Sequence, residues 1–381
     1  MAVTADGSET GDRAPALRVL VLTPDFPPMR GGIQVLAHRL VRHARRSRMR
    51  VVTLNCPQGE FFDRREALDV RRTRSGGRRH HRSAILALNG LALAEARRFR
   101  PDVVLSVHIV LSPAARMIRR AIGAPTAQYL HADEIRARPA LASFAVRGAD
   151  AVVAVSEHTR RLALGAGADP RRLHRIPAGV DIPASSRAAR PSRPTVLTVA
   201  RLHDRYKGHD ILVRAMPLIR ARVPDAQWVV VGEGPLRPEL ERLVAEHGLD
   251  GHVRFTGDVS DAERDACLDQ AHVFAMPARL PGGGVGGEGF GIVFLEANAH
   301  GLPVVAGNVG GALDAVVHGE TGLLVDPGDH DAVASAIADL LLDPERATAI
   351  GRAGAARART FAWPTIAERV EELLLRLRPA G

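Results

Sequence analysis

The amino-acid sequence predicts an α/β protein built from two doubly wound domains. A length of 381 residues suits two domains of ordinary size. Short apolar runs rich in Val, Leu and Ile alternate with segments of helical periodicity, which is typical of parallel sheets. A segment rich in Pro, Ser and Arg divides the chain after residue 183. We therefore expect a disordered tail over residues 1–16, a first domain over 17–183, a linker over 184–194, a second domain over 195–362 and a last helix over 363–381.

Composition and cysteine content indicate a cytoplasmic globular protein. Hydrophobic residues make up 46% of the chain and charged residues 25%, which is ordinary globular composition. Cys56 and Cys267 lie far apart and form no CxxC motif, which fits a reducing compartment. The N-terminal sequence lacks the apolar segment of a signal peptide. The mostly apolar run over residues 84–96 is too short and too polar to span a bilayer.

Charge is distributed unevenly along the chain. Residues 1–190 contain 33 Arg and 16 Asp or Glu, a balance of +17, whereas the remainder has a balance of −7. This asymmetry suggests that the first half meets an anionic partner, such as a phosphate-bearing acceptor or an anionic membrane surface. Nucleic acid is a poorer candidate because aromatic residues are only 4% and no motif that reads RNA or DNA is present. An arginine bias that merely decorates a solvated face explains the count equally well.

The first element is an apolar strand over residues 18–22, followed by a loop that ends in Gly31-Gly32 and by a helix from about Ile33. This order opens a doubly wound domain, in which ligands bind at the carboxyl ends of the strands. The two glycines allow close approach of the backbone to a phosphate, although a simple turn is the more frequent meaning of such a pair. No G-x-G-x-x-G dinucleotide fingerprint is present.

The first helix is expected to turn an apolar side toward the core and a basic side toward solvent. Any membrane contact of that basic side would therefore be electrostatic. Further arginines follow between residues 64 and 82. The side chains assigned to the basic side are His38, Arg39, Arg42, His43, Arg45 and Arg46.

Three further strands are predicted in the first domain, over residues 101–108, 125–129 and 151–156. The second of them delivers the sequence HADE, which places His131 just beyond the carboxyl end of a strand. A single histidine is more often structural, but this position favours ligand binding. Ser156 is expected to cap the helix that begins at Glu157.

The second domain begins with a strand over residues 195–200 that leads into RLHDRYKG. Lys207 is the only lysine among 52 basic residues, so a compact ammonium group stands where the chain otherwise uses arginine. Arg201 offers a planar fork for bidentate phosphate contact on the same strand-end loop. Either cation alone would be read as a surface charge, but together they favour an anion site. A strand over residues 228–231 ends in Gly232, and another strand covers residues 253–259.

The richest segment is EGFGIVFLEANAHGLPVVAG over residues 288–307. Gly289 and Gly291 open a helix whose N-terminus directs free N–H groups and positive partial charge toward a ligand. Two carboxylates, Glu288 and Glu296, lie eight positions apart, one at the mouth of the loop and one about two turns into the helix. A buried strand follows from Pro303. A phosphorylated or hydroxyl-rich ligand suits this arrangement.

This segment resembles the E-x7-E motif of the retaining glycosyltransferases of family 4, and the resemblance extends from about residue 18 to 377. The wider string from residue 280 to 327 is most similar to bacterial enzymes that mannosylate phosphatidylinositol lipids. The family has the GT-B fold, in which two Rossmann-like domains face each other and the last helix crosses back onto the first domain. The sequence departs from the usual pattern at Ala132, where the family often has Gly, and at Ala178, where it usually has Asn.

The resemblance implies a hexosyltransferase that moves a mannose, glucose or N-acetylglucosamine unit from a GDP- or UDP-sugar to a hydroxyl group. Four residues would serve catalysis, with Arg201 and Lys207 holding the diphosphate, Glu288 the sugar hydroxyls and His131 the reacting face of the sugar. Glu296 would bind the ribose. The remaining implied donor contacts are Gly31, Gly32, Gly232, Gly257, Val259, Phe290, Gly291 and Ile292, and the implied acceptor contacts are Asp25 and Gln34.

We expect no cofactor beyond the sugar nucleotide and no metal. Asp329-His330-Asp331 spells the D-x-D metal signature of another glycosyltransferase fold, but its position at the start of a predicted helix favours capping. The acceptor is expected to be lipid-linked or a small molecule, with possible peripheral contact of the protein at the inner membrane face. A transferase of natural-product biosynthesis acting on an aminocyclitol-type scaffold, or a non-catalytic protein that binds nucleotide sugars, is the alternative.

Overall fold

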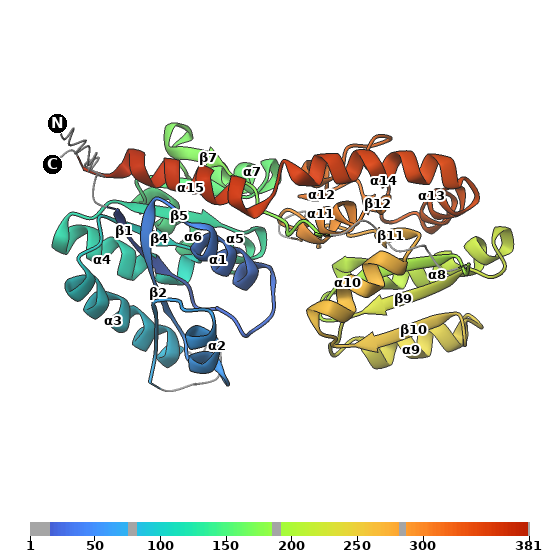
Figure 1. Ribbon diagram of the computed structural model, residues 1–381, viewed down its shortest axis with the longest axis horizontal. Helices are drawn as coiled ribbons and strands as arrows, with labels where there is room; N and C mark the ends of the chain where they lie inside the picture. Colours follow the sequence, from blue (N-terminus) through green and yellow to red (C-terminus); the bar gives the residue numbers. More distant parts are fainter. Residues whose placement is uncertain (1–15, 75–81, 185–191, 282–286, 380–381) are drawn as a thin grey trace, which may run out of the picture.

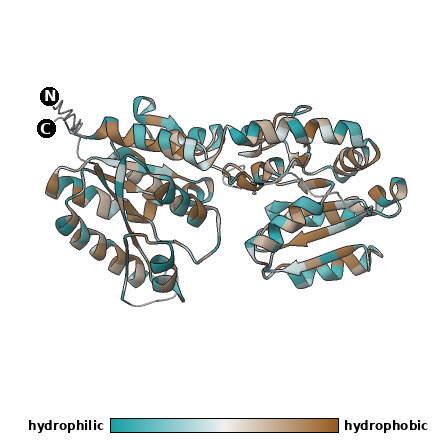
Figure 2. Ribbon diagram, in the orientation of Figure 1, coloured by the Kyte–Doolittle hydropathy of each residue, from teal (hydrophilic) through white to brown (hydrophobic). Residues whose placement is uncertain are grey.

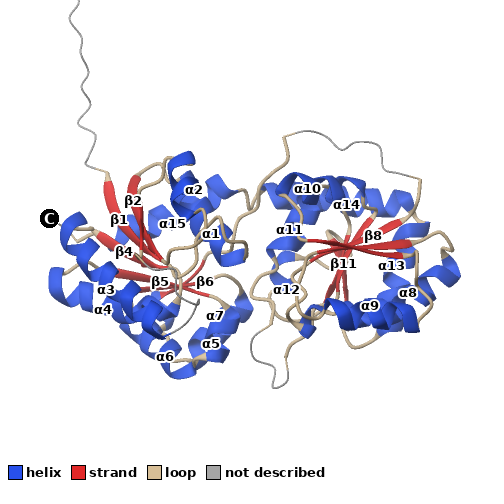
Figure 3. Cartoon of the chain, turned by 90° about the horizontal axis from the view of Figure 1, so that it is seen from below, coloured by secondary structure: helices blue, strands red, loops and turns tan. Residues whose placement is uncertain are grey.

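The computed structural model describes residues 16–74, 82–184, 192–281 and 287–379, and shows two α/β domains side by side (Figure 1). The expected N-terminal tail and most of the expected linker lie outside the described residues. Each domain has one parallel sheet with helices on both faces (Figure 3). Hydrophobic residues are concentrated in the strands and on the helix faces that cover them (Figure 2).

The N-terminal sheet has seven strands in the order β3-β2-β1-β4-β5-β6-β7, all of them parallel. Its central strands β4, β5 and β6 are buried throughout, which explains the mostly apolar sequences of β4 and β6. The strands are β1 (Leu17–Leu22), β2 (Ser47–Thr53), β3 (Val70–Arg72), β4 (Val103–Ser106), β5 (Thr126–Leu130), β6 (Ala151–Ala154) and β7 (Leu173–Arg175).

In the described part of this domain, seven α-helices and two short 3-10 turns connect the strands. Ser156 accepts a hydrogen bond from the backbone N–H of Thr159 and so caps α7, as the sequence predicts. The helices are α1 (Gly32–His43), α2 (Gly59–Arg65), α3 (Arg82–Phe99), α4 (Ser112–Ile122), α5 (Ala132–Ala137), α6 (Pro139–Gly148) and α7 (Glu157–Gly165), with η1 (Ile109–Leu111) and η2 (Pro170–Arg172).

The C-terminal sheet has six parallel strands in the order β10-β9-β8-β11-β12-β13. In both sheets the strand order reverses beside the first strand, as in a Rossmann domain, and such a switch point forms a crevice at the carboxyl ends of the strands. The strands are β8 (Thr195–Val199), β9 (Gln227–Val231), β10 (Val253–Gly257), β11 (Val273–Met276), β12 (Val304–Gly307) and β13 (Gly322–Val325).

Helices of the C-terminal half cover both faces of this second sheet, except for α15, which packs on the N-terminal domain. Asp329 caps α13 by accepting from the backbone N–H groups of Asp331 and Ala332, which agrees with the capping role predicted for D-x-D. The helices are η3 (Arg205–Lys207), α8 (His209–Arg222), α9 (Arg237–Glu246), α10 (Asp261–Gln270), α11 (Ile292–Ala299), α12 (Ala312–Ala315), α13 (His330–Leu342), α14 (Pro344–Arg359) and α15 (Trp363–Leu377).

The chain passes between the two domains twice, and the two crossings pack against each other. The N–H of Val180 donates to the carbonyl of Phe361 at 2.9 Å, and the ring of Trp363 lies where a side chain on Gly179 would stand. Helix α15 then runs back along the N-terminal domain and packs against α1 (Figure 1). Its buried Glu371 accepts hydrogen bonds from the backbone N–H groups of Arg45 and Arg46, which fixes the helix to that domain.

Candidate active site

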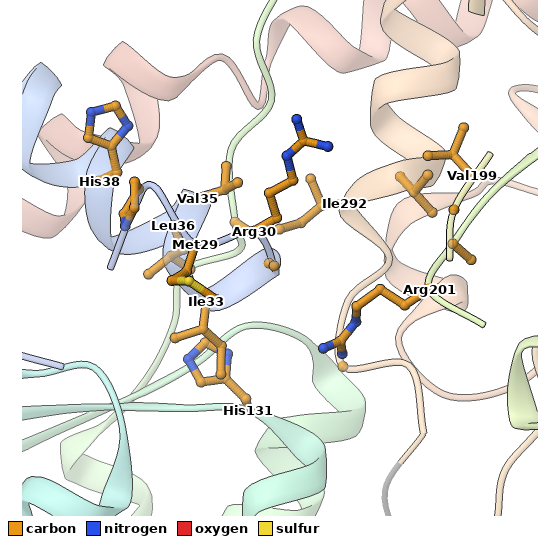
Figure 4. A pocket seen from close by; sticks show the side chains of 18 of the residues that line it. Met29, Arg30, Ile33, Val35, Leu36, His38, His131, Val199, Arg201 and Ile292 are labelled. Carbon is orange, nitrogen blue, oxygen red and sulfur yellow. The ribbon is translucent and has the colours of Figure 1, made fainter. Parts of the chain in front are cut away.

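A cavity of about 1080 Å³ lies between the two domains and is lined by both of them. Loops that follow β1, β5, β8, β9, β10 and β11 supply its walls, so the carboxyl ends of the two sheets face each other across it. Figure 4 shows Arg30 and His131 from the N-terminal domain and Arg201 from the C-terminal domain around this space. Its volume is that of a site for a sizeable small molecule.

The N-termini of two helices meet at the cavity, α1 from the first domain and α11 from the second. A Cβ on Gly32 would stand 3.7 Å from the Cδ1 of Ile292, so the two helix ends lie close together across the cleft. Gly291 has φ +87° and precedes α11, a conformation that favours glycine. Unpaired N–H groups and positive partial charge at both ends suit a diphosphate between them.

Two cations from the loop after β8 enter the same cavity. Arg201 pairs with no carboxylate in the described residues, and its side chain extends into the open space (Figure 4). Lys207 ends η3, and its Nζ donates to Oε2 of Glu288 at 2.5 Å. Both groups of this ion pair are more than four-fifths buried, so water screens their charges weakly. The predicted cation pair and the first carboxylate of E-x7-E therefore stand together.

Backbone packing holds the loop that carries Glu288. The N–H of Gly311 donates to the carbonyl of Glu288 at 2.9 Å, and a Cβ on Gly311 would stand 2.4 Å from the backbone of Gly289. From the opposite domain, Asp133 accepts from the N–H of Gly287 at 3.1 Å and lies 3.5 Å from the hydroxyl of Tyr206. Burial raises the pKa of Tyr206, so its hydroxyl is a proton donor at neutral pH.

His131 is the N-cap of α5, and its ring stacks on Tyr129. Its Nε2 lies 3.1 Å from the carbonyl oxygen of Val107, which makes this nitrogen the donor. Burial lowers the pKa of His131 to about 4, so the imidazole is neutral at physiological pH. The carboxyl of Glu134 accepts from the backbone N–H of His131 at 2.9 Å, and burial raises the pKa of Glu134 to about 8.

The remaining predicted donor residues line another wall of the cavity. Gly232 and Gly257 join the ends of β9 and β10, because the N–H of Gly232 donates to the carbonyl of Gly257 at 3.0 Å. A Cβ on Gly232 would stand 2.0 Å from the carbonyl oxygen of Ala200, so only glycine fits there. Burial raises the pKa of Glu296 on α11, and the nearby charge of Arg264 opposes that shift. Val259, Phe290 and Ile292 complete this wall.

Arg30 crosses the cleft and was not found from the sequence. Its Nη1 donates to Oδ1 of Asp258 at 2.5 Å and also to the carbonyl of Val259, although the two partners lie more than 220 positions further along the chain. Asp133 and Tyr206 were missed for the same reason. Each of these contacts depends on the relative placement of the two domains, which local sequence patterns do not predict.

The two predicted acceptor residues do not line the cavity. Asp25 is buried, and its backbone N–H and carbonyl contact the hydroxyl of Thr23. Gln34 is buried against Gly31, where a Cβ would stand 2.4 Å from its Oε1. Their role in acceptor binding stays a prediction.

The basic surface predicted on α1 needs a correction. His38 is not on the solvent side, because it is buried between the rings of Phe26 and Phe62 and lines the cavity. Burial lowers its pKa to about 4. Arg72, one of the further arginines, is also buried and forms a two-pronged ion pair with Asp63. The excess of arginine therefore does not translate directly into surface charge.

The described residues contain no cluster of three or more His, Cys, Asp or Glu placed to hold a metal ion. In the same part of the chain, every helix is too short or too polar to cross a membrane.

Comparison with known proteins identifies the family. Residues 30–183 match the model described as Glycosyltransferase Family 4, and residues 184–357 match that described as Glycosyl transferases group 1. The chain is 38% identical over 380 residues to the GDP-mannose-dependent alpha-(1-6)-phosphatidylinositol monomannoside mannosyltransferase of Mycobacterium tuberculosis, with 94% of this chain and 98% of that protein covered. It is 32% identical to the GDP-mannose-dependent monoacylated alpha-(1-6)-phosphatidylinositol monomannoside mannosyltransferase of Corynebacterium glutamicum, with 94% and 97% covered.

Solved structures support the same fold. The crystal structure of Anabaena Alr3699/HepE in complex with UDP and glucose superposes with a TM-score of 0.78 at 21% identity, covering 94% of this chain and all of that one. Two parallel-sheet domains, a cleft lined from both, and family matches over most of the length agree with one another. The chain is a hexosyltransferase with the GT-B fold and belongs to glycosyltransferase family 4.

Proposed function

We propose that this protein transfers mannose from GDP-mannose to a hydroxyl group of a phosphatidylinositol mannoside, with retention of configuration at the anomeric carbon. The observation that carries the proposal is 38% identity over nearly the whole chain to a phosphatidylinositol monomannoside mannosyltransferase. The cavity supports it, because it offers cations, helix N-termini and buried carboxylates in one space. An acceptor embedded in a lipid surface would bring the protein to the membrane peripherally.

The donor would lie between the two helix N-termini. Its diphosphate would contact Arg201, Lys207 and the N–H groups beside Gly31 and Gly32. Glu288 would accept hydrogen bonds from hydroxyls of the mannose, and the ion pair with Lys207 would place this carboxylate next to the phosphate. Glu296 would accept two hydrogen bonds from the ribose hydroxyls, since a carboxylate has acceptor capacity for both.

The reaction breaks the bond between the anomeric carbon and the diphosphate oxygen, and forms a bond from the same carbon to the acceptor oxygen. Negative charge grows on the departing GDP while the sugar acquires oxocarbenium character. Fixed cations and N–H groups stabilise that charge without reorganisation. The acceptor hydroxyl loses its proton to a phosphate oxygen of the leaving group on the same face of the sugar. His131, kept neutral by burial, would contact the sugar beside the reacting carbon.

Transfer assays with purified protein test the proposal. GDP-mannose and UDP-glucose would each be offered with phosphatidylinositol monomannoside in detergent micelles, with an aminocyclitol, and with no acceptor. The proposal predicts a mannosylated lipid from GDP-mannose and from no other pair. Transfer only to the aminocyclitol would favour natural-product biosynthesis, whereas tight donor binding without transfer or hydrolysis would favour a non-catalytic protein.

A further inference from the structure

The cations that line the cavity differ in whether a carboxylate already neutralises them. Five of them are paired: Arg30 with Asp258, Arg39 with Asp181, Arg65 with Glu66, Arg264 with Asp265, and Lys207 with Glu288. Within the described ranges, Arg138 and Arg201 line the same cavity and form no ion pair. A cation that faces a cleft without a protein partner is available for an anionic ligand.

The two unpaired arginines lie on opposite domains. Arg201 follows β8 in the C-terminal domain and is assigned above to the diphosphate of the donor. Arg138 belongs to the N-terminal domain, where it ends α5 and precedes α6. One sugar nucleotide already has Arg201, Lys207 and two helix ends for its diphosphate, so Arg138 is left for a second anion.

Arg138 stands at a fixed position relative to the predicted reaction centre. His131 and Arg138 are the two caps of α5, so they are about 10 Å apart along the helix, at ~1.5 Å per residue. An acceptor whose hydroxyl reacts beside His131 would therefore present a more distant group to Arg138. The backbone N–H of Arg138 donates to the carbonyl of Glu134 at 3.1 Å, which holds this end of the helix.

Nearby carboxylates do not neutralise Arg138. Glu134 lies on the same helix, and the charge of Arg138 lowers its pKa, but burial is the larger effect and raises that pKa to about 8. The two oxygens of Glu134 accept from the backbone N–H groups of Ile109 and His131, and the carboxyl forms no ion pair with Arg138 in the described residues. Asp133 is directed toward Gly287 and Arg136 instead. The guanidinium of Arg138 therefore keeps its positive charge on the wall of the cavity that the N-terminal domain supplies.

We propose that Arg138 binds the phosphodiester of the acceptor and so makes the enzyme select a phosphoinositide head group over the same sugars without phosphate. This inference rests on the proposed function, because it assumes that the acceptor is a phosphatidylinositol mannoside. A contact between a guanidinium and a phosphate is strong and directional. Removing the guanidinium of Arg138 should weaken the binding of acceptor and leave the reaction of the donor unchanged.

Steady-state kinetics with three variants provide the first test. Arg138→Met is expected to raise the KM for phosphatidylinositol monomannoside by about tenfold to a hundredfold, the loss of one charge-assisted hydrogen bond, with kcat and the KM for GDP-mannose unchanged. Arg138→Lys should recover part of that loss. Arg136→Met removes a cation from the same helix that does not line the cavity, and should match the unmodified protein. Equal losses in Arg136→Met and Arg138→Met, or a loss in kcat alone, would overturn the inference.

Calorimetry separates this inference from the proposed function. With GDP bound, glycerophosphoinositol should bind the unmodified protein and bind Arg138→Met at least tenfold more weakly, whereas inositol should not distinguish the two. Inorganic phosphate that displaced glycerophosphoinositol with equal affinity would indicate a general anion site and overturn the head-group assignment. If the protein bound glycerophosphoinositol through Arg138 but transferred no mannose to the lipid, the proposed function would fail and the subsite would stand.

Discussion

Replacing Lys207 by alanine is expected to lower kcat for mannose transfer by about 10²–10³, the cost of losing one preorganised group that stabilises developing charge. The structure supports a value in this range because Lys207 and Glu288 are only 14% and 17% exposed. The charge of Lys207 therefore acts where water screens it weakly. Removing it also leaves the Glu288 carboxylate without its cation, which should weaken donor binding by about 1–3 kcal/mol.

The same short turn supplies a matched control. Arg205 lies two residues before Lys207 on η3, but its guanidinium pairs with Glu239 on the surface and does not line the cavity. Arg205→Ala should keep kcat and the KM for GDP-mannose within a factor of about two, because an exposed ion pair contributes ~0–1 kcal/mol. Initial rates of transfer and calorimetric titration with GDP would be measured for both variants. Turnover of Lys207→Ala close to normal, or equal losses in the two variants, would refute the reasoning.

Three further predictions follow from the same geometry. Gly291→Ala should lower the free energy of unfolding by about 1–3 kcal/mol, because residue 291 has a positive φ and an added Cβ would stand 2.4 Å from the ring of Phe294. Gly90→Ala, on α3 with open space around it, should be neutral or stabilising in the same denaturant titration. Burial lowers the pKa of His38 in the folded protein to about 4, so the unfolded chain binds more protons between pH 6.5 and 4 and the free energy of unfolding falls as the pH is lowered. His38→Phe should remove about 2 kcal/mol of the decrease in unfolding free energy between pH 8 and pH 5. An unchanged pH dependence of stability in this variant would be evidence against the buried neutral imidazole. Glu296→Ala should weaken GDP binding in calorimetry by about tenfold to a hundredfold, and an unaltered affinity would count against the ribose role.

Much of the fold, and the grouping of Arg201, Lys207 and Glu288 in one cavity, could be predicted from local sequence. Alternating strands and helices predict two doubly wound sheets, and ligands bind such sheets at known edges, so Arg201, Lys207 and Glu288 could be brought to one place in advance. The single lysine and the clustered glycines strengthened that prediction. The ion pair between Lys207 and Glu288 could not be predicted, because the two residues are 81 positions apart.

The part of the cavity wall that the N-terminal domain supplies was harder to predict for physical reasons. His38 was expected in solvent because helical periodicity places it beside Arg39 and Arg42, but Phe62 on α2 covers it. Local patterns predict no helix over residues 59–65, so they place no ring against His38. No sequence motif includes Arg138. It is distinguished from most other cations of the cavity only by the lack of an ion pair in the described residues.

In the proposed mechanism, cations and N–H groups of the protein neutralise the charge of the departing GDP. The most direct measurement is the initial rate of mannose transfer from GDP-mannose to phosphatidylinositol monomannoside in excess EDTA. We expect a rate equal to that without chelator, together with a loss of about 10²–10³ in Lys207→Ala under the same conditions. A rate that collapsed in EDTA and returned on adding magnesium or manganese would contradict it.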